Sequence, residues 1–139
     1  MKTIVVGYDE TEPAKRALAR AAELAEAFGS KLIVTSVARL LVGATAARGV
    51  GPIDPLDEPE WHKEQLERAE AFLAEQRIDA QFEVTLGGPA AAIVDLAEKR
   101  GADLIVVGTR EPGLLQRLMG LSVSAAVENR AHCDVLIVH

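Results

Sequence analysis

Residues 104–124 read LIVVGTREPGLLQRLMGLSVS, and this stretch decides the fold. An apolar run, residues 104–107, ends at Gly108, and a polar segment separates it from a second periodic segment that Ser122 opens, residues 123–130. The pattern predicts a strand, a loop and the start of a helix. A helix N-terminus presents unpaired N–H groups and the positive end of its dipole, and Ser122 and Ser124 add hydroxyl groups. This edge is therefore suited to an anion such as a phosphate.

The rest of the chain alternates short apolar runs with segments of helical period. Thr11 is a good N-cap, Pro13 suits a first turn, and a long amphipathic helix follows until Gly29. A further helix is expected between Pro89 and Gly101. Unbroken runs rich in β-branched residues are typical of strands buried on both faces. The runs that predict strands are residues 4–7, 32–37, 81–86, 104–107 and 135–138.

Strands that alternate with helices at this spacing imply right-handed crossovers between parallel strands. The sequence therefore predicts an α/β fold, with a five-stranded parallel sheet and helices on both of its faces. In such a sheet the ligand crevice lies beyond the C-terminal ends of the strands, where the strand order reverses. This rule brings Asp9, Val37 and Gly108 together at one cleft. Residues 39–58 form a long connection without a clear period, which is typical of a functional lid or of partial disorder.

The helix predicted over about residues 60–76 carries apolar residues on one side and acidic residues on the other. Trp61 stands near its start and is expected to pack against this helix or to close the long connection before it. The residues expected on the apolar side are Leu66, Ala69, Phe72 and Leu73.

Composition limits the class of protein and its partners. With 139 residues and 49% apolar content, the chain is expected to form one domain, residues 1–139. A net charge of −6 argues against nucleic acid as a partner. Cys133 is the only cysteine, so no internal disulfide forms, and a reducing, cytoplasmic compartment is expected. The start of the chain has the pattern of a first strand and not of a signal peptide. The longest apolar region is interrupted by polar residues and cannot form a membrane span, so no membrane partner is expected.

Several catalytic and metal-binding motifs are missing from the sequence. It contains no dinucleotide fingerprint, no P-loop, no H-E-x-x-H and no G-x-S-x-G. His62, His132 and His139 fall in different predicted elements, which argues against a metal cluster and against nucleophilic catalysis.

The spacing around Gly108 resembles the motif of the universal stress proteins, in which Gly, two residues, Gly and nine residues precede Gly-Ser or Gly-Thr. Here Gly108 is followed at the matching positions by Glu111, Leu121 and Ser122. The resemblance extends over the whole chain through VVGYDET, TLGGPAAAI, ADLIVVGTR and HCDVLIVH. It implies a Rossmann-like fold of the adenine nucleotide alpha hydrolase-like type, with the strands in the order 3-2-1-4-5.

The same resemblance implies a ligand, ATP or AMP, and a set of contacts. Asp9 and the backbone of Val37 would hold the adenosine, and a magnesium ion bridging from Glu111 to a phosphate is a further hypothesis. By the resemblance, the phosphate would be held by Gly108, Ser122 and Ser124. The neighbouring Arg110, Gly120 and Val123 are further candidates, and Arg110 is also suited to being a solvated surface residue or a partner of Glu111.

Two motif glycines are replaced in this chain. The Glu111 carboxylate would repel phosphate, and the Leu121 side chain would crowd it. Other residues nearby could compensate for these changes. Flexibility is supplied by Gly113 and Gly120, and positive charge by Arg110 and Arg117.

Two hypotheses about function follow from this balance. The first is a homodimeric stress-response regulator that binds an adenine nucleotide. The second is a dimeric interaction module that has lost the nucleotide.

A third hypothesis, slow nucleotide hydrolysis, has the least support because only Asp9 or Glu111 could serve as a base. A protein that is not an enzyme is therefore expected.

Some of the site residues also have simpler structural interpretations. Asp9 is also suited to capping the turn into the first helix, and Ser122 and Ser124 are also suited to being N-caps.

The last apolar run bears on assembly. It is expected to form an edge strand without a Lys or Pro to prevent pairing with another chain. The family resemblance likewise implies a homodimer, joined through Val135, Leu136, Ile137 and Val138.

Overall fold

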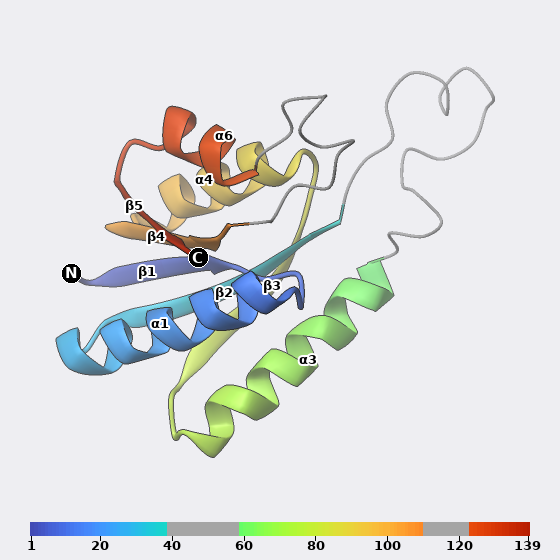
Figure 1. Ribbon diagram of the computed structural model, residues 1–139, viewed down its shortest axis with the longest axis vertical. Helices are drawn as coiled ribbons and strands as arrows, with labels where there is room; N and C mark the ends of the chain where they lie inside the picture. The colour runs from blue at the N-terminus through green and yellow to red at the C-terminus, as the bar shows by residue number, and fades with distance from the viewer. Residues whose placement is uncertain (39–58, 110–122) are drawn as a thin grey trace.

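The computed structural model describes residues 1–38, 59–109 and 123–139 (Figure 1). Five strands alternate with four helices over these residues, as the sequence predicts. In chain order the elements are β1 (Thr3–Gly7), α1 (Glu12–Phe28), β2 (Lys31–Ala38), α3 (Pro59–Glu75), β3 (Ala80–Leu86), α4 (Pro89–Arg100), β4 (Leu104–Gly108), α6 (Val123–Arg130) and β5 (Asp134–Val138).

All four strand pairings are parallel, and the strands lie in the order β3-β2-β1-β4-β5. The predicted order is confirmed. Helices α1 and α3 cover one face of the sheet, while α4 and α6 cover the other (Figure 1). From β1 the chain adds β2 and β3 on one side of the sheet and then β4 and β5 on the other side. The strand order therefore reverses at β1, and a sheet of this type forms its ligand crevice at such a point.

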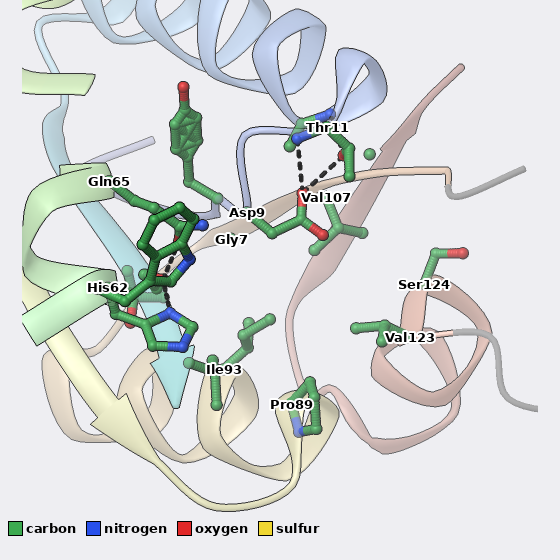
Figure 2. Close-up of a pocket in the computed structure, with 17 residues that line it drawn as sticks. Gly7, Asp9, Thr11, His62, Gln65, Pro89, Ile93, Val107, Val123 and Ser124 are labelled. Carbon is green, nitrogen blue, oxygen red and sulfur yellow. Dashed lines mark hydrogen bonds between the residues drawn. The ribbon is translucent and has the colours of Figure 1, made fainter. Parts of the chain in front are cut away.

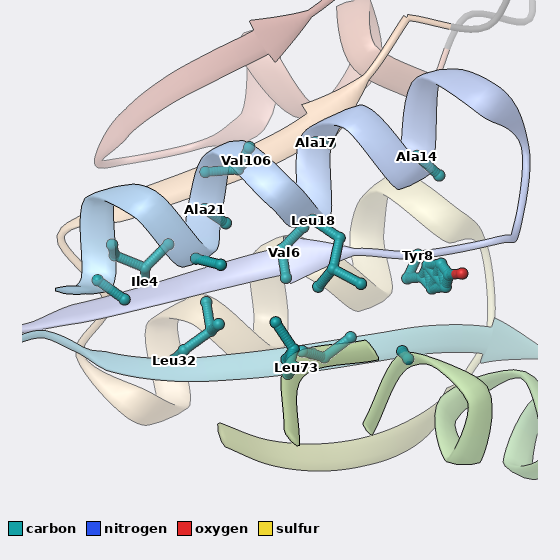
Figure 3. Packing of buried hydrophobic residues seen from close by; sticks show 14 of the residues in the cluster. Ile4, Val6, Tyr8, Ala14, Ala17, Leu18, Ala21, Leu32, Leu73 and Val106 are labelled. Carbon is teal, nitrogen blue, oxygen red and sulfur yellow. The ribbon is translucent and has the colours of Figure 1, made fainter. Parts of the chain in front are cut away.

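Side chains from the central strand enter two cores, one on each face of the sheet. Ile4 and Val6 pack with α1 and α3 (Figure 3), whereas Val5 between them packs with α4, and all three are fully buried. Because successive side chains of a strand point to opposite faces, an apolar run without polar alternation is required here. The expectation of strands buried on both faces is confirmed for β1.

Local signals in the sequence place the helix ends. Thr11 caps α1 by accepting a hydrogen bond from the backbone N–H of Ala14 at 3.3 Å, and Gly29 ends the helix in the left-handed region at φ 63°. Gly101 ends α4 in the same way. These positions agree with the predicted ends.

The buried side of α3 differs from the expected one. Leu66, Ala69 and Leu73 are buried, but Phe72 is 38% exposed, so its predicted place on the apolar side is wrong. Two polar residues, His62 and Gln65, are buried instead, each 6% exposed. They lie one turn before Leu66 and Ala69, which extends the buried stripe toward the end of the helix nearest the cleft.

Asp103 joins the beginnings of β4 and β1. Its Oδ2 accepts hydrogen bonds from the backbone N–H groups of Lys2 at 2.8 Å and Thr3 at 3.0 Å, while its own N–H donates to the Thr3 carbonyl. The two backbone donors favour the carboxylate and lower the pKa of Asp103 from its ordinary value.

This lowered pKa predicts a pH-dependent contribution to stability. A group whose pKa is lower in the folded state stabilises the fold above its unfolded pKa, and this stabilisation is lost as pH falls through the folded pKa. Asp103→Asn is therefore expected to lower the Tm at pH 7, and this difference is expected to shrink as pH falls through the lowered pKa of the folded state, below the ordinary value of 3.8. Asp95→Asn, at an exposed carboxylate on α4, is the control. A Tm difference that stays constant as pH falls from 7 into the acid range would contradict the expectation.

The edge strand β5 packs its side chains into both cores. Val135 and Ile137 lie against the α4 and α6 side, and Leu136 and Val138 against the α1 side. Its outer backbone edge has no neighbouring strand among the described residues.

Cys133, just before β5, is partly buried, and this burial raises the pKa of its thiol. None of the described helices is long and apolar enough to cross a membrane.

Candidate functional site

A cavity of about 360 Å³ opens beyond the C-terminal ends of β1, β2 and β4. The structure brings together at this cavity Asp9, Val37, Gly108, Val123 and Ser124, which the sequence analysis named. Their convergence confirms the predicted location of the cleft, and the volume lies in the usual range for small-molecule sites.

Other predicted site residues, Arg110, Gly120 and Ser122, lie outside the described residues. So do Glu111 and Leu121, the two departures from the motif, and the connection 39–58. The described part of the chain contains no group of three or more His, Cys, Asp or Glu side chains that could hold a metal ion. Since Glu111 is outside this part, the magnesium hypothesis stays a prediction.

Asp9 organises the turn between β1 and α1. Its Oδ1 accepts hydrogen bonds from the Thr11 hydroxyl at 2.6 Å and from the Thr11 backbone N–H at 3.2 Å. The side chain is exposed and lines the cavity (Figure 2). Asp9 therefore has the turn-capping role considered in the sequence analysis, and this role holds its carboxylate at the cavity wall.

The end of β2 presents backbone groups to the cavity. β1 ends at Gly7, which pairs with Thr35, and the last bond on that side runs from Tyr8 N–H to the Thr35 carbonyl at 2.8 Å. β2 continues for three more residues, and its Ala38 carbonyl accepts from Gly87 on the β3 side. Because backbone groups alternate in direction along a strand, the N–H and C=O of Val37 point to the side where β1 has already ended.

Gly108 ends β4 where α1 begins. A Cβ atom at this position would lie 2.4 Å from the Pro13 carbonyl carbon and 2.7 Å from the Ala14 nitrogen. These are backbone atoms, so a glycine is required for the close approach of the two elements. The requirement for Gly108 is thus explained by packing, whether or not its backbone also contacts a phosphate.

Helix α6 directs its first turn at the opposite end of the cavity from α3 (Figure 2). Ser124 is the second residue of this helix and is 7% exposed. Since an N-cap precedes the first helical residue, the N-cap interpretation is wrong for Ser124. The positive end of the helix dipole and a serine hydroxyl lie together at this end, an arrangement that favours an anion.

The α3 wall of the cavity carries a buried polar group that the sequence analysis missed. Ser36 Oγ lies 2.5 Å from His62 Nδ1 and donates to Gln65 Oε1 at 2.9 Å. His62, Gln65 and Ser36 all line the cavity, and so does Trp61, which is 52% exposed. The signal was the helical spacing of His62 and Gln65 with Leu66 and Ala69, which places two polar side chains on a buried stripe.

An ion pair connects the α3 wall to the Asp9 turn. Arg68 donates to both carboxylate oxygens of Glu10, at 2.8 and 2.5 Å, and its guanidinium lies 5.9 Å from the centre of the Trp61 ring system. The hydrogen bonds from Arg68 hold the pKa of Glu10 below its ordinary value. Glu10 has φ 62°, a left-handed conformation that is uncommon for a residue with a side chain, and the two-fold pairing with Arg68 stabilises it.

The sheet order, the helices on both faces and the cavity beyond β1, β2 and β4 together define a Rossmann-like α/β protein with a ligand cavity at the reversal of strand order. The amino-acid sequence matches the universal stress protein family over residues 1–139, and the chain belongs to this family.

Individual relatives agree with this membership. A universal stress protein from Thermus aquaticus is 38% identical over 148 aligned positions, covering 99% of this chain and 98% of the relative. A crystal structure of a universal stress protein in complex with cAMP is 33% identical, with a TM-score of 0.70, covering 99% of this chain and 97% of that one. A universal stress protein from Archaeoglobus fulgidus in complex with dAMP has a TM-score of 0.73 at 24% identity, covering 100% and 98%, and supports the fold.

Proposed function

We propose that this protein binds an adenine nucleotide in the cavity and that occupancy of the cavity regulates its action in a stress response. The base would lie at the β2 and α3 end, the ribose at Asp9 and the phosphate at the start of α6. The observation that carries the proposal is the continuation of β2 past the end of β1, which directs one backbone donor and one backbone acceptor of Val37 into the cavity.

The pairing edge of adenine has the complementary pattern. Its ring N1 accepts a hydrogen bond and its 6-amino group donates one. The Val37 N–H would donate to N1, and the Val37 C=O would accept from the amino group. The complexes of two relatives with cAMP and dAMP support a ligand of this class.

The arrangement favours holding a nucleotide over cleaving it, so we propose a binding function without catalysis. Asp9 is the only acidic side chain among the described residues that line the cavity, and its Oδ1 already accepts two hydrogen bonds from Thr11. A carboxylate fixed in this way can accept hydrogen bonds from ribose hydroxyls without moving.

Calorimetric titration with AMP, cAMP and ATP, each with and without magnesium, tests the proposal. Binding of at least one of them with a micromolar Kd is the expected result. Absence of binding by all three would contradict it. If a Glu111→Gly, Leu121→Gly double variant then bound AMP, the protein would be assigned instead to the second hypothesis, an interaction module whose nucleotide site has been lost.

A second part of the proposal is that two copies form a symmetric dimer through β5. The strand lies at the edge of the sheet, its side chains are partly buried in its own cores, and the outer edge offers backbone groups for pairing. Light scattering at micromolar concentration is expected to give twice the chain mass of 14.8 kDa. A mass equal to that of one chain would contradict the dimer.

A further inference from the structure

The turn between β1 and α1 depends on the backbone of Glu10. Asp9 on one side of it accepts two hydrogen bonds from Thr11 on the other side, at 2.6 and 3.2 Å. Glu10 itself has φ 62°, a conformation in which a Cβ atom comes close to a backbone carbonyl oxygen. If Glu10 rotated into the ordinary region, the chain would change direction between Asp9 and Thr11, and these hydrogen bonds would be lost. The orientation of the Asp9 carboxylate therefore depends on the left-handed conformation of Glu10.

Among the described residues other than glycine, only one more has a positive φ, and its place in the fold explains it. Arg77, at φ 59°, lies just beyond the end of α3. The N–H of Ile78 donates to the Leu73 carbonyl at 3.0 Å, a bond that closes the end of the helix. Glu10 precedes a helix instead of following one, so the usual helix ending does not account for its conformation.

The side chain of Glu10 is held from a distant element. Arg68 of α3 donates from Nε to Glu10 Oε2 at 2.8 Å and from Nη2 to Glu10 Oε1 at 2.5 Å. Two parallel bonds fix both the position and the orientation of a carboxylate. Helix α3 is itself anchored on the sheet by the buried side chains of Leu66, Ala69 and Leu73. The turn is therefore attached to a packed part of the fold that lies 58 positions away in the sequence.

The pair lies beside the cavity without forming its wall. The side chains of Arg68 and Glu10 are 50% and 25% exposed, and neither residue is among the described residues that line the cavity. Asp9 and Thr11, on either side of Glu10, do line it. An effect of the pair on a ligand would consequently be transmitted through the turn.

We propose that Arg68 is a positioning residue of the nucleotide site, which acts through Glu10 to hold the Asp9 turn in the form that meets the ribose. This inference rests on the proposed nucleotide binding and deepens it. A glycine at position 10 would adopt a positive φ without a partner, whereas the glutamate of this chain depends on the arginine. Without the pair a smaller fraction of the protein has the competent turn, and the apparent affinity falls by that fraction.

Three single variants test this role by calorimetric titration with AMP. Arg68→Met and Glu10→Ala each remove the ion pair and keep a side chain at position 10, so each is expected to weaken binding about three- to tenfold. Glu10→Gly removes the same pair and the same charge, but it permits the positive φ. It is expected to bind AMP within about twofold of the wild type. Glu10→Ala and Glu10→Gly differ by a single methyl group and form a matched pair.

A double variant separates positioning from a direct effect of charge. In the Glu10→Gly background, Arg68→Met is expected to cause no further loss, because the turn no longer depends on the arginine. If Arg68 instead attracted the phosphate, or if it supported α3 in general, its removal would weaken AMP in this background as well. Adenosine, which carries no phosphate, is expected to show the same pattern as AMP, because Asp9 is proposed to contact the ribose.

The outcomes distinguish the inference from the proposal beneath it. If the wild type binds AMP but Glu10→Ala and Glu10→Gly bind it equally well, or Arg68→Met weakens it as much in the Glu10→Gly background, the positioning role is overturned and the proposed function stands. If the wild type binds neither AMP nor adenosine, the proposed function is overturned, and the positioning role with it. Losses in Arg68→Met and Glu10→Ala that are absent from both variants with glycine at position 10 support the inference.

Discussion

Replacing Gly108 with alanine is expected to lower the free energy of unfolding by at least about 3 kcal/mol, which corresponds to about 10 °C in Tm for a domain of this size. The added Cβ would lie 2.4 Å from the Pro13 carbonyl carbon and 2.6 Å from its oxygen. Backbone atoms in the first turn of α1 cannot move aside as a side chain can. Either the helix must shift away from β4, which loosens the core between them, or β4 must shift within the sheet.

Gly88→Ala is the matched control for this experiment. Gly88 precedes α4 at φ −67°, and a Cβ there would meet nothing within 4 Å. A change of about 1 kcal/mol or less is expected, because alanine is a poorer N-cap than glycine but the added Cβ meets no other atom within 4 Å. Thermal unfolding followed by circular dichroism measures both variants. A Gly108→Ala protein as stable as the wild type would show that α1 does not pack against β4 as described.

The second large effect is expected in binding. Asp9→Ala should weaken the affinity for AMP about 10- to 100-fold, because hydrogen bonds to a charged group contribute about 1.5–3 kcal/mol each. The carboxylate is held at the cavity wall by two hydrogen bonds from Thr11, so it is already oriented before the ligand arrives. Calorimetric Kd values for the wild type and the variant give the measurement.

The capping role of Asp9 requires its own control. Thr11→Val removes the hydroxyl that bonds to Asp9 and caps α1, but it leaves the carboxylate itself and its hydrogen bond from the backbone N–H of residue 11. If Asp9 contacts the ligand, Thr11→Val should weaken binding by a smaller factor than Asp9→Ala, because one of the two hydrogen bonds that orient the carboxylate remains. Equal losses in the two variants would mean that Asp9 acts only through the turn.

Local and periodic signals were sufficient to predict most of the fold. The apolar runs around Val5 and Ile105 have no polar alternation, which requires burial on both faces and hence a parallel sheet with two helical layers. Capping residues such as Thr11 and Gly29 placed helix ends, because these ends depend on bonds within a few residues. The location of the cleft followed from the parallel topology, which gathers the ends of distant strands.

The composition of the site was less predictable, because it depends on contacts between distant elements. Ser36 and His62 are 26 positions apart, and nothing in either segment alone indicates their hydrogen bond. The steric requirement at Gly108 likewise depends on how closely α1 approaches β4, a tertiary distance that no local pattern contains. In α3, the expected apolar side included Phe72 because the buried positions of His62 and Gln65 were not recognised as part of the stripe.

The most direct test of the central claim is a titration of ¹⁵N-labelled protein with AMP, followed through the backbone amide shifts. A nucleotide that lies along the cavity should shift the amide signals of residues 9–11, 36–38, 107–109 and 123–125. The signals of residues 29–31 and 101–103, near the N-terminal ends of β2 and β4 and away from the cavity, should not shift. Unchanged spectra at millimolar AMP, or shifts confined to the N-terminal ends of these strands, would contradict nucleotide binding in this cleft.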